Sequence, residues 1–378
     1  MIITIDNITP YLLHKGFLDT ESIVNNDLKI IDVSKKNRNL KVIRKHNTSY
    51  LIKQPTSIDN LDSRKTIQRE AGIYSLIQEK SEFKSISTIV PRILKFDAAL
   101  NLLITELITN GKSLNEYIYS SSTLEFPNTL AAMLGKAIAM YHQIFAKQGD
   151  SARLSFLPRA FPSIFYMFHP GPEVLGRLSS ANLKLLKLIQ KSFESSNLFE
   201  SLVNDWRVQT LIHGDIRWDN ILIPFLPDNN NESGRIILVD WEFASFGDPA
   251  WDIGSVFHDF IVFWLYSLRI TANETIEQLL TSAQLPLQRI QSAIRVFWYE
   301  YTKVLGIDNG KSNELLYRST RYCAINLLHS VYESSFDETE LSNISMYTVQ
   351  LSSNILNDVY SAITHLLGIP LGGYFLSL

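Results

Sequence analysis

Two apolar stretches of the chain each run into a cluster of polar residues, the pattern of a strand that delivers side chains to a site at its end. The first stretch reads LIHGDIRWDNILI, residues 211–223, and the second reads IILVDWEF, residues 236–243. The residues in them that could act as ligands or bases are His213, Asp215, Asn220 and Asp240. Carboxylate and amide oxygens suit Mg2+, which binds through one or two protein carboxylates together with substrate phosphates. Phosphoryl transfer is therefore the starting hypothesis.

Phosphoryl transfer gives each of these residues a different task. An acceptor hydroxyl must lose its proton and meet the γ-phosphate in line, and little other covalent chemistry is needed from the protein. Asp215 is expected to accept or orient the proton, and Asn220 and Asp240 to give oxygens to the metal ion. His213 would brace the loop with a neutral ring. Taken singly, Asp215 could be a turn former and Asn220 a helix cap, so the hypothesis depends on the order of all four.

The elements that must position these residues begin with short strands. Residues 28–54 alternate apolar or β-branched runs with polar turns, as LKIIDVS, LKVIRKH and YLIKQ, which predicts an antiparallel meander of three strands. Two more strands are expected at residues 90–96 and 102–108. A helix is expected at residues 63–78, where apolar residues recur at helical spacing. Five strands and one helix would form a small lobe.

The first turn of this meander, residues 34–39, is basic and contains no glycine. It is therefore not the Gly-x-Gly-x-x-Gly loop of protein kinases or dinucleotide folds. Turn amides can form anion-binding concavities without glycine, so the turn could still cover phosphates, with Ser34 and Asn39 as candidate nucleotide contacts. A solvated hairpin tip is an equally simple interpretation.

A lysine and a glutamate of the small lobe suggest how a nucleotide would be held. Lys53 ends the third strand and Glu70 lies on the helix that follows. A strand lysine that faces a helix glutamate would form an ion pair that positions a diphosphate. Lys and Glu are usually solvated surface residues. The pair gains weight only from its place in the chain, ahead of the polar clusters at residues 211–243.

After the fifth strand the periodicity becomes mostly helical. We therefore predict an α+β chain in which residues 1–108 form the small lobe and residues 109–378 a larger, mainly helical lobe. The lobe boundary is expected near residues 108–113, where an exposed strip of backbone could bind a flat base such as adenine, with Glu106 and Ile108 as candidate nucleotide contacts. Clefts between lobes are common ligand sites.

Composition excludes several other classes of protein. The 378 residues are 46% hydrophobic and 19% charged, enough for a large core. A net charge of -3 gives no general attraction for nucleic acid or acidic membranes, and we expect neither as a partner.

Cys323 is the single cysteine, so no internal disulfide can form. The apolar run at residues 253–270 is interrupted by His258 and Asp259, which predicts a buried helix. No signal-peptide pattern opens the chain, and we expect a cytoplasmic location.

The two polar clusters resemble the signatures of the aminoglycoside phosphotransferase and choline kinase family, a group of protein-kinase-like small-molecule kinases. The first signature, His-Gly-Asp followed after four residues by Asn, spans residues 213–220. The second is Val-Asp-Trp-Glu at residues 239–242, followed by Gly-Asp-Pro-Ala-Trp-Asp at 247–252. The resemblance, which covers roughly residues 28–257, implies a bilobal protein-kinase-like fold. The roles that it implies are a catalytic base (Asp215), metal ligands (Asn220 and Asp240), a structural aspartate that supports the catalytic loop (Asp252) and a nucleotide-positioning pair (Lys53 and Glu70).

The chain departs from this family inside the catalytic loop. Arg217, Trp218 and Asp219 stand where many relatives have a His-Pro-Gly run. All three are candidates for the acceptor side of the site. Trp218 and Asp219 could reach the acceptor, or could pack and cap the loop. The segment at residues 150–206 and the chain after residue 260 match no substrate class.

The leading hypothesis is a kinase that uses ATP or GTP with magnesium to phosphorylate a hydroxyl of a small molecule. One alternative acceptor is a Ser or Thr side chain of a peptide, phosphorylated during maturation of a modified natural product. A different class of function is a pseudokinase that binds nucleotide as a scaffold. The presence of Asp215, Asn220 and Asp240 together argues against a scaffold, which has no chemical need for all three.

Overall fold

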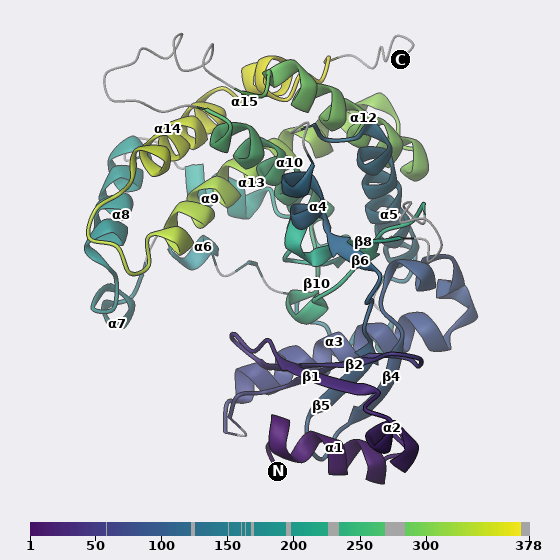
Figure 1. Cartoon of the computed structure of the whole chain (residues 1–378). Helices are drawn as coiled ribbons and strands as arrows, with labels where there is room; N and C mark the ends of the chain where they lie inside the picture. Colours follow the sequence, from purple (N-terminus) through teal and green to yellow (C-terminus); the bar gives the residue numbers. More distant parts are fainter. Residues whose placement is uncertain are drawn as a thin grey trace. The chain divides into compact units, whose positions relative to one another are not determined.

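The computed structural model describes residues 1–371, except for 58, 122–124, 150, 160, 163, 168–169, 194–197, 226–233 and 269–283. The chain forms two compact units (Figure 1). The first unit contains residues 1–117, 152–157 and 219–244, and the second contains residues 118–151, 158–218 and 245 onward. The first unit thus continues nine residues beyond residue 108, to residue 117, and also includes two later segments of the chain. The limit of the nucleotide-covering lobe at residue 108 stays a prediction.

A five-stranded antiparallel sheet forms the centre of the first unit, in the order β1-β2-β3-β5-β4. Its strands are β1 (Leu28–Asp32), β2 (Arg38–Arg44), β3 (Tyr50–Gln54), β4 (Ile93–Asp97) and β5 (Leu102–Glu106). All five strands were expected from the alternation of apolar and polar residues, and the mixed fold with one such sheet and a mostly helical remainder is confirmed. The last two strands begin or end two to three residues inside their predicted limits.

Helices cover the two faces of this sheet (Figure 1). Because successive side chains of a strand point to opposite faces, Ile52 and Ile104 join the core under α1 (Ile5–His14). Lys53, one residue further along β3, points to the other face, where Glu70 of α3 (Leu61–Glu79) contacts it. The small lobe was expected to contain one helix, and the unit also contains α1, α2 (Thr20–Val24) and the 3-10 helix η1 (Ser81–Ile89).

The two apolar stretches with which the sequence analysis began form short pieces instead of long strands. The first contains β7 (Thr210–Ile212), a loop, the 3-10 helix η3 (Trp218–Asn220) and β8 (Ile221–Pro224). The second contains β9 (Ile237–Leu238) and the 3-10 helix η4 (Trp241–Phe243). In the first unit β8 pairs with β9 and with β6 (Gly111–Ser113), and in the second unit β7 pairs with β10 (Ser245–Gly247). Asp240 has a left-handed backbone, with φ 69°, which ends β9.

The second unit is mostly helical. Its elements, besides the strands named above, are α4 (Leu114–Ser120, which begins in the first unit), α5 (Asn128–Ala146), α6 (Ile164–Met167), α7 (Pro172–Leu175), α8 (Ser180–Phe193), α9 (Leu198–Asn204), α10 (Pro249–Tyr266), α12 (Leu287–Leu305), α13 (Asn309–Ser334), α14 (Asn343–Asn357), α15 (Val359–Ser361) and the π-helix η5 (Ala362–Leu366). Segment 152–157 of the first unit contains the 3-10 helix η2 (Ala152–Leu154).

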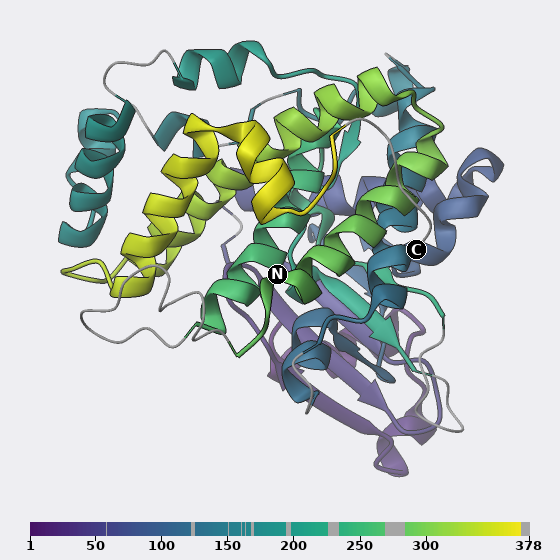
Figure 2. The ribbon, with the colours of Figure 1, turned by 90° about the horizontal axis from the view of Figure 1, so that it is seen from above.

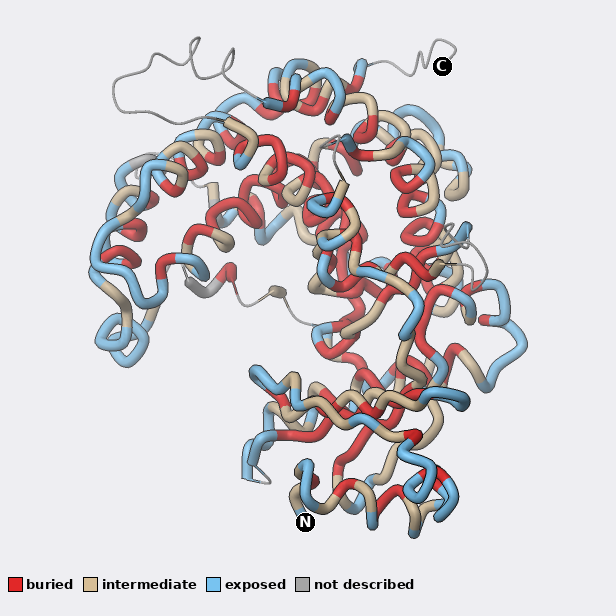
Figure 3. The backbone as a smooth tube through the Cα atoms, viewed as in Figure 1, coloured by how far each residue is buried: buried red, intermediate tan, exposed pale blue. Residues whose placement is uncertain are grey.

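Two pairs of helices build the core of this unit, α5 with α12 and α10 with α13 (Figure 2). The backbones approach closely because each pair has a glycine at its contact. A Cβ added to Gly135 of α5 would collide with the carbonyl oxygen of Phe297, and one added to Gly254 of α10 with that of Ser319. The backbone of α10 is buried over most of its length (Figure 3). Among the described residues, no helix is both long enough and apolar enough to cross a membrane.

Candidate functional site

Lys53 connects two carboxylates that come from distant parts of the first unit. Its ammonium nitrogen lies 2.8 Å from Oε2 of Glu70 and also contacts Oδ1 of Asp240. Tyr74, one turn further along α3, donates its hydroxyl to Glu70 Oε1 at 2.9 Å. Burial alone would lower the pKa of Lys53, but the two carboxylates outweigh burial and raise it. Lys53 is therefore a permanently charged cation that holds the helix and the end of β9 together.

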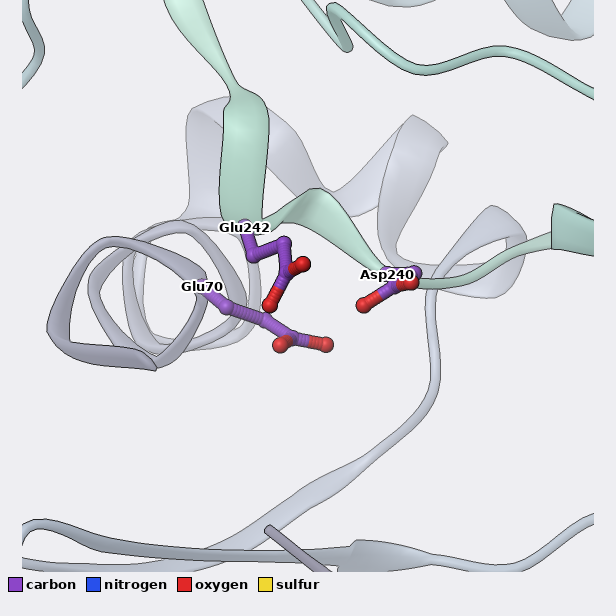
Figure 4. Close-up of side chains that lie close together, drawn as sticks. All are labelled: Glu70, Asp240 and Glu242. Atoms are coloured by element: carbon purple, nitrogen blue, oxygen red, sulfur yellow. The ribbon is translucent and has the colours of Figure 1, made fainter. Parts of the chain in front are cut away.

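Three carboxylates gather at this point (Figure 4). One oxygen from each of Glu70, Asp240 and Glu242 lies within 4.8 Å of the others. Glu70 comes from α3, whereas Asp240 and Glu242 flank the first residue of η4. The left-handed backbone of Asp240 turns the chain here, so that both acidic residues lie on the side of α3. An all-oxygen donor set of this kind fits magnesium, which prefers hard oxygen ligands.

Asn220 lies next to the same strand end. Its backbone carbonyl accepts a hydrogen bond from Val239 at 3.0 Å, one residue before Asp240. Ile221 pairs with Leu238 in the β8–β9 ladder, and the Asn220 side chain is buried. The two predicted metal ligands, 5 and 25 residues after Asp215 in the chain, thus lie on paired segments of the first unit.

In the second unit, the carboxylate of Asp252 holds the start of the loop that carries Asp215. Oδ2 accepts hydrogen bonds from the His213 backbone N–H at 2.8 Å and the Tyr141 hydroxyl at 2.6 Å, and lies 3.2 Å from His142 Nε2. Oδ1 accepts from the Gly214 N–H at 3.0 Å. Asp252 and His213 are fully buried. The loop therefore enters its turn on a rigid support that α5 and α10 supply.

Asp215 follows directly and is paired with Arg217. Its backbone N–H donates to Nδ1 of His213 at 3.3 Å, so the buried ring contacts the backbone of the loop. Oδ1 of Asp215 lies 2.9 Å from Nε and 2.8 Å from Nη2 of Arg217. Arg217 also reaches Glu333 of α13, at 3.6 Å. Arg217 therefore fixes the orientation of the Asp215 carboxylate and connects it to α13.

The comparison with known proteins agrees with these features. Residues 27–274 match the family model described as the phosphotransferase enzyme family. The chain belongs to this family. The resemblance found in the sequence is thereby confirmed, and both signature segments lie within the matched residues.

Individual relatives are distant. A 4-hydroxytryptamine kinase from Psilocybe cyanescens is 26% identical over 223 residues, which cover 55% of this chain and 58% of that protein. The chain thus spans little more than half the length of this curated relative. Among solved structures, choline kinase LicA from Streptococcus pneumoniae is 15% identical, with a TM-score of 0.42 over 91% of this chain and 99% of that one. Macrolide 2'-phosphotransferase MphH from Brachybacterium faecium is 13% identical, with a TM-score of 0.46 over 93% and 98%.

Other residues predicted to contact the nucleotide have local structural partners. Ser34 Oγ accepts from the Asn39 N–H at 3.0 Å, so these two residues close the turn between β1 and β2. Glu106 ends β5 and pairs with Arg92 at 3.0 Å, on the surface. Ile108 is half-buried beyond the end of β5. Their contacts with a nucleotide stay predictions.

Trp218, where the chain departs from the family pattern, packs in an aromatic cluster of the second unit. Its ring centroid lies 5.2 Å from that of Phe126 and 5.1 Å from that of Phe263. The side chain is 5% exposed, and its backbone N–H donates to Asp259 at 2.7 Å. The sequence left open whether Trp218 reaches the acceptor or packs in the protein. In this structure its side chain packs against other aromatic rings. Asp219, the next residue, is exposed.

Trp218→Phe should change the free energy of unfolding by less than about 1 kcal/mol, because two effects oppose each other. Phe leaves a cavity, which destabilises, but it also removes a buried indole N–H that has no acceptor among the described residues. Urea denaturation measures the change. A loss above about 2 kcal/mol would mean that the indole has a partner. A fall in kcat/KM for the acceptor at unchanged stability would instead place Trp218 at the acceptor.

Two residues that the sequence analysis did not single out contact residues of the candidate site. Tyr141 donates to Asp252, and Asn37 donates to Glu242. Tyr141 occupies a position of α5 that the apolar periodicity assigns to the core, and only its contact with Asp252 shows that its hydroxyl is used. Asn37 lies in a polar turn, where an amide side chain is ordinary. No signal in the sequence distinguishes it from its exposed neighbours.

Proposed function

We propose that this chain transfers the γ-phosphate of ATP or GTP to a hydroxyl of a small-molecule acceptor. The observation that supports the proposal most directly is the buried contact of Lys53 with both Glu70 and Asp240. A strand lysine, a helix glutamate and an aspartate at a strand end are the parts that kinase-type phosphoryl transfer uses to hold a nucleotide and its metal ion. Membership of the phosphotransferase enzyme family supports the same reaction.

The residues have separate roles in this proposal. Lys53, held by Glu70, binds the phosphates of the nucleotide. Asp240 and Asn220 hold magnesium, which neutralises phosphate charge when it is bound. Asp215 accepts the proton of the acceptor hydroxyl, and Asp252 with His213 keeps the backbone of Asp215 in place.

The acceptor is tested with a panel. We include 4-hydroxytryptamine, the compound in the name of the Psilocybe cyanescens relative, together with amino sugars, choline and short peptides that contain Ser or Thr. Purified protein is incubated with each acceptor, magnesium and either ATP or GTP, and acceptor-dependent release of nucleoside diphosphate is measured. Turnover with a small molecule supports the proposal. Turnover with peptides alone favours the peptide kinase. A nucleotide-induced rise in melting temperature without any turnover favours the pseudokinase.

Lys53→Ala should weaken nucleotide binding by about 10- to 100-fold, the effect of losing a charge-assisted hydrogen bond. The substitution also leaves the Glu70 and Asp240 carboxylates without the ammonium that they share. Affinity for ATP is measured by calorimetry. Lys53→Arg is the matched control, because it keeps the charge, and should retain more affinity than Lys53→Ala. Equal affinity in wild type and Lys53→Ala would contradict the role of Lys53.

A further inference from the structure

Asn37 lies at the tip of a hairpin turn but points inward. Its neighbours Ser34, Lys35 and Lys36 are exposed, whereas Asn37 is only 7% exposed. Residues at the tip of a polar turn are normally solvated. A buried amide at this place must be paired, and Asn37 uses both ends of its amide.

The two ends of the Asn37 amide attach the turn to different elements of the first unit. Nδ2 donates to Oε2 of Glu242 at 2.7 Å, a buried hydrogen bond between residues 205 positions apart. Oδ1 accepts from the Ser63 hydroxyl, in the first turn of α3. Lys36, beside Asn37, places its ammonium 5.9 Å from the ring centroid of Phe243. Residues 36–37 therefore contact residues 242–243 at two places.

Glu242 is itself held in position and belongs to the carboxylate cluster. Its backbone carbonyl accepts from Arg69 Nη1 at 2.9 Å, and its carboxylate lies within 4.8 Å of those of Glu70 and Asp240 (Figure 4). The turn is thus attached to one of the acidic groups that gather around the proposed metal ligand Asp240. Lys35 and Lys36, on the same turn, carry positive charge to this part of the unit.

We propose that Asn37 is a positioning residue, which holds the basic turn of residues 33–37 against Glu242 so that the turn can cover the phosphates of a bound nucleotide. The proposal rests on the proposed function for its consequence in catalysis. We name the contact the Asn37–Glu242 clasp. It is a hydrogen bond from a neutral donor to a buried carboxylate, a stronger class of hydrogen bond than one between neutral groups.

The first test measures how fast trypsin cleaves the turn in the absence of nucleotide. Trypsin cleaves after Lys35 and Lys36 when the turn opens, and cleavage of a transiently open segment follows the population of the open form. Asn37→Ala removes the donor and should accelerate this cleavage about tenfold. Cleavage after Lys45, in the next hairpin turn, is the internal reference. Thr48→Ala, an exposed substitution in that second turn, is the matched control and should leave cleavage after Lys35 and Lys36 unchanged.

Exchanging the amide of residue 37 and the carboxylate of residue 242 tests whether their hydrogen bond itself keeps the turn closed. Asn37→Asp places a second carboxylate against Glu242 and should open the turn further than Asn37→Ala. Adding Glu242→Gln to Asn37→Asp restores an amide and a carboxylate with their places exchanged, and should return cleavage toward the wild-type rate. If Asn37→Ala is cleaved at the wild-type rate, or if the double variant is cleaved as fast as Asn37→Asp alone, the clasp is refuted.

Nucleotide binding then separates this proposal from the proposed function. Asn37→Ala should raise the KM for magnesium nucleotide several-fold while kcat for the acceptor changes little, because the turn acts on binding and not on the hydroxyl. If wild type binds nucleotide and Asn37→Ala has the same KM, positioning by Asn37 is refuted and the phosphotransferase stands. If wild type binds no nucleotide, the proposed function fails, whatever the cleavage assay shows.

Discussion

Asp215→Asn is expected to lower kcat by about 10²- to 10⁴-fold, the usual contribution of a positioned general base. Asn has nearly the same shape as Asp, and its carbonyl oxygen can still accept from Arg217, which now contacts Oδ1 at 2.8 Å. The substitution therefore removes the ability to take a proton while it keeps the loop in place. Turnover is measured with the best acceptor of the panel, and nucleotide affinity is measured by calorimetry.

The control for this prediction is Asp337→Asn, a substitution of the same type in the exposed segment that follows α13. It should leave kcat and the melting temperature unchanged. Asp215→Asn should leave the affinity for nucleotide within about twofold of wild type, since a base acts in the transition state and not on the bound nucleotide. Unchanged turnover in Asp215→Asn would show that another group accepts the proton.

Asp252→Asn is expected to reduce the free energy of unfolding by about 3–5 kcal/mol, the range for disruption of a buried, charged hydrogen-bonded group. Both oxygens of Asp252 accept hydrogen bonds from backbone N–H groups, Oδ2 from His213 and Oδ1 from Gly214. An amide must replace one oxygen with an NH2 group, so in either orientation a donor faces a donor. Urea denaturation gives the stability, and kcat should fall with it, because the loop that carries Asp215 loses its support.

Tyr141→Phe is the graded counterpart of this substitution. It removes the hydroxyl that donates the 2.6 Å hydrogen bond to Asp252 and should cost about 1.5–3 kcal/mol. A loss in Asp252→Asn no larger than that in Tyr141→Phe would argue against the four-contact support.

The stability difference between wild type and Asp252→Asn should depend on pH in a defined direction. Burial tends to raise the pKa of Asp252, but hydrogen bonds from His142 and Tyr141 outweigh it and lower the pKa below its ordinary value of 3.8. A carboxyl group whose pKa is lower in the folded state contributes its full stability above the pKa of the unfolded state, and loses that contribution as the pH falls through the folded value. The difference should therefore be constant near neutral pH and narrow below about pH 3.8.

Much of the fold and of the site could be predicted from the sequence because the signals are local. The strands of the sheet follow from alternation within single segments, and helix α3 from its apolar spacing. The chemical residues are recognisable because His213, Asp215 and Asn220 stand within eight consecutive positions. Nothing in the sequence indicates that positions 135 and 254 require glycine. The requirement comes from a second helix, whose backbone passes too close to Gly135 and to Gly254 for a Cβ atom.

The sequence by itself determined which residue types are present and in what order, and this was sufficient for the family and for the chemistry that its signatures imply. Only the tertiary structure decided which of those residues share a partner. Lys53 contacts Glu70 across 17 positions and Asp240 across 187, and Asp252 is held by Tyr141 across 111. Asn37, an ordinary turn residue by sequence, is buried against Glu242. The physical reason is that periodicity reports which face of an element is buried, whereas a hydrogen bond between distant segments depends on how those elements pack.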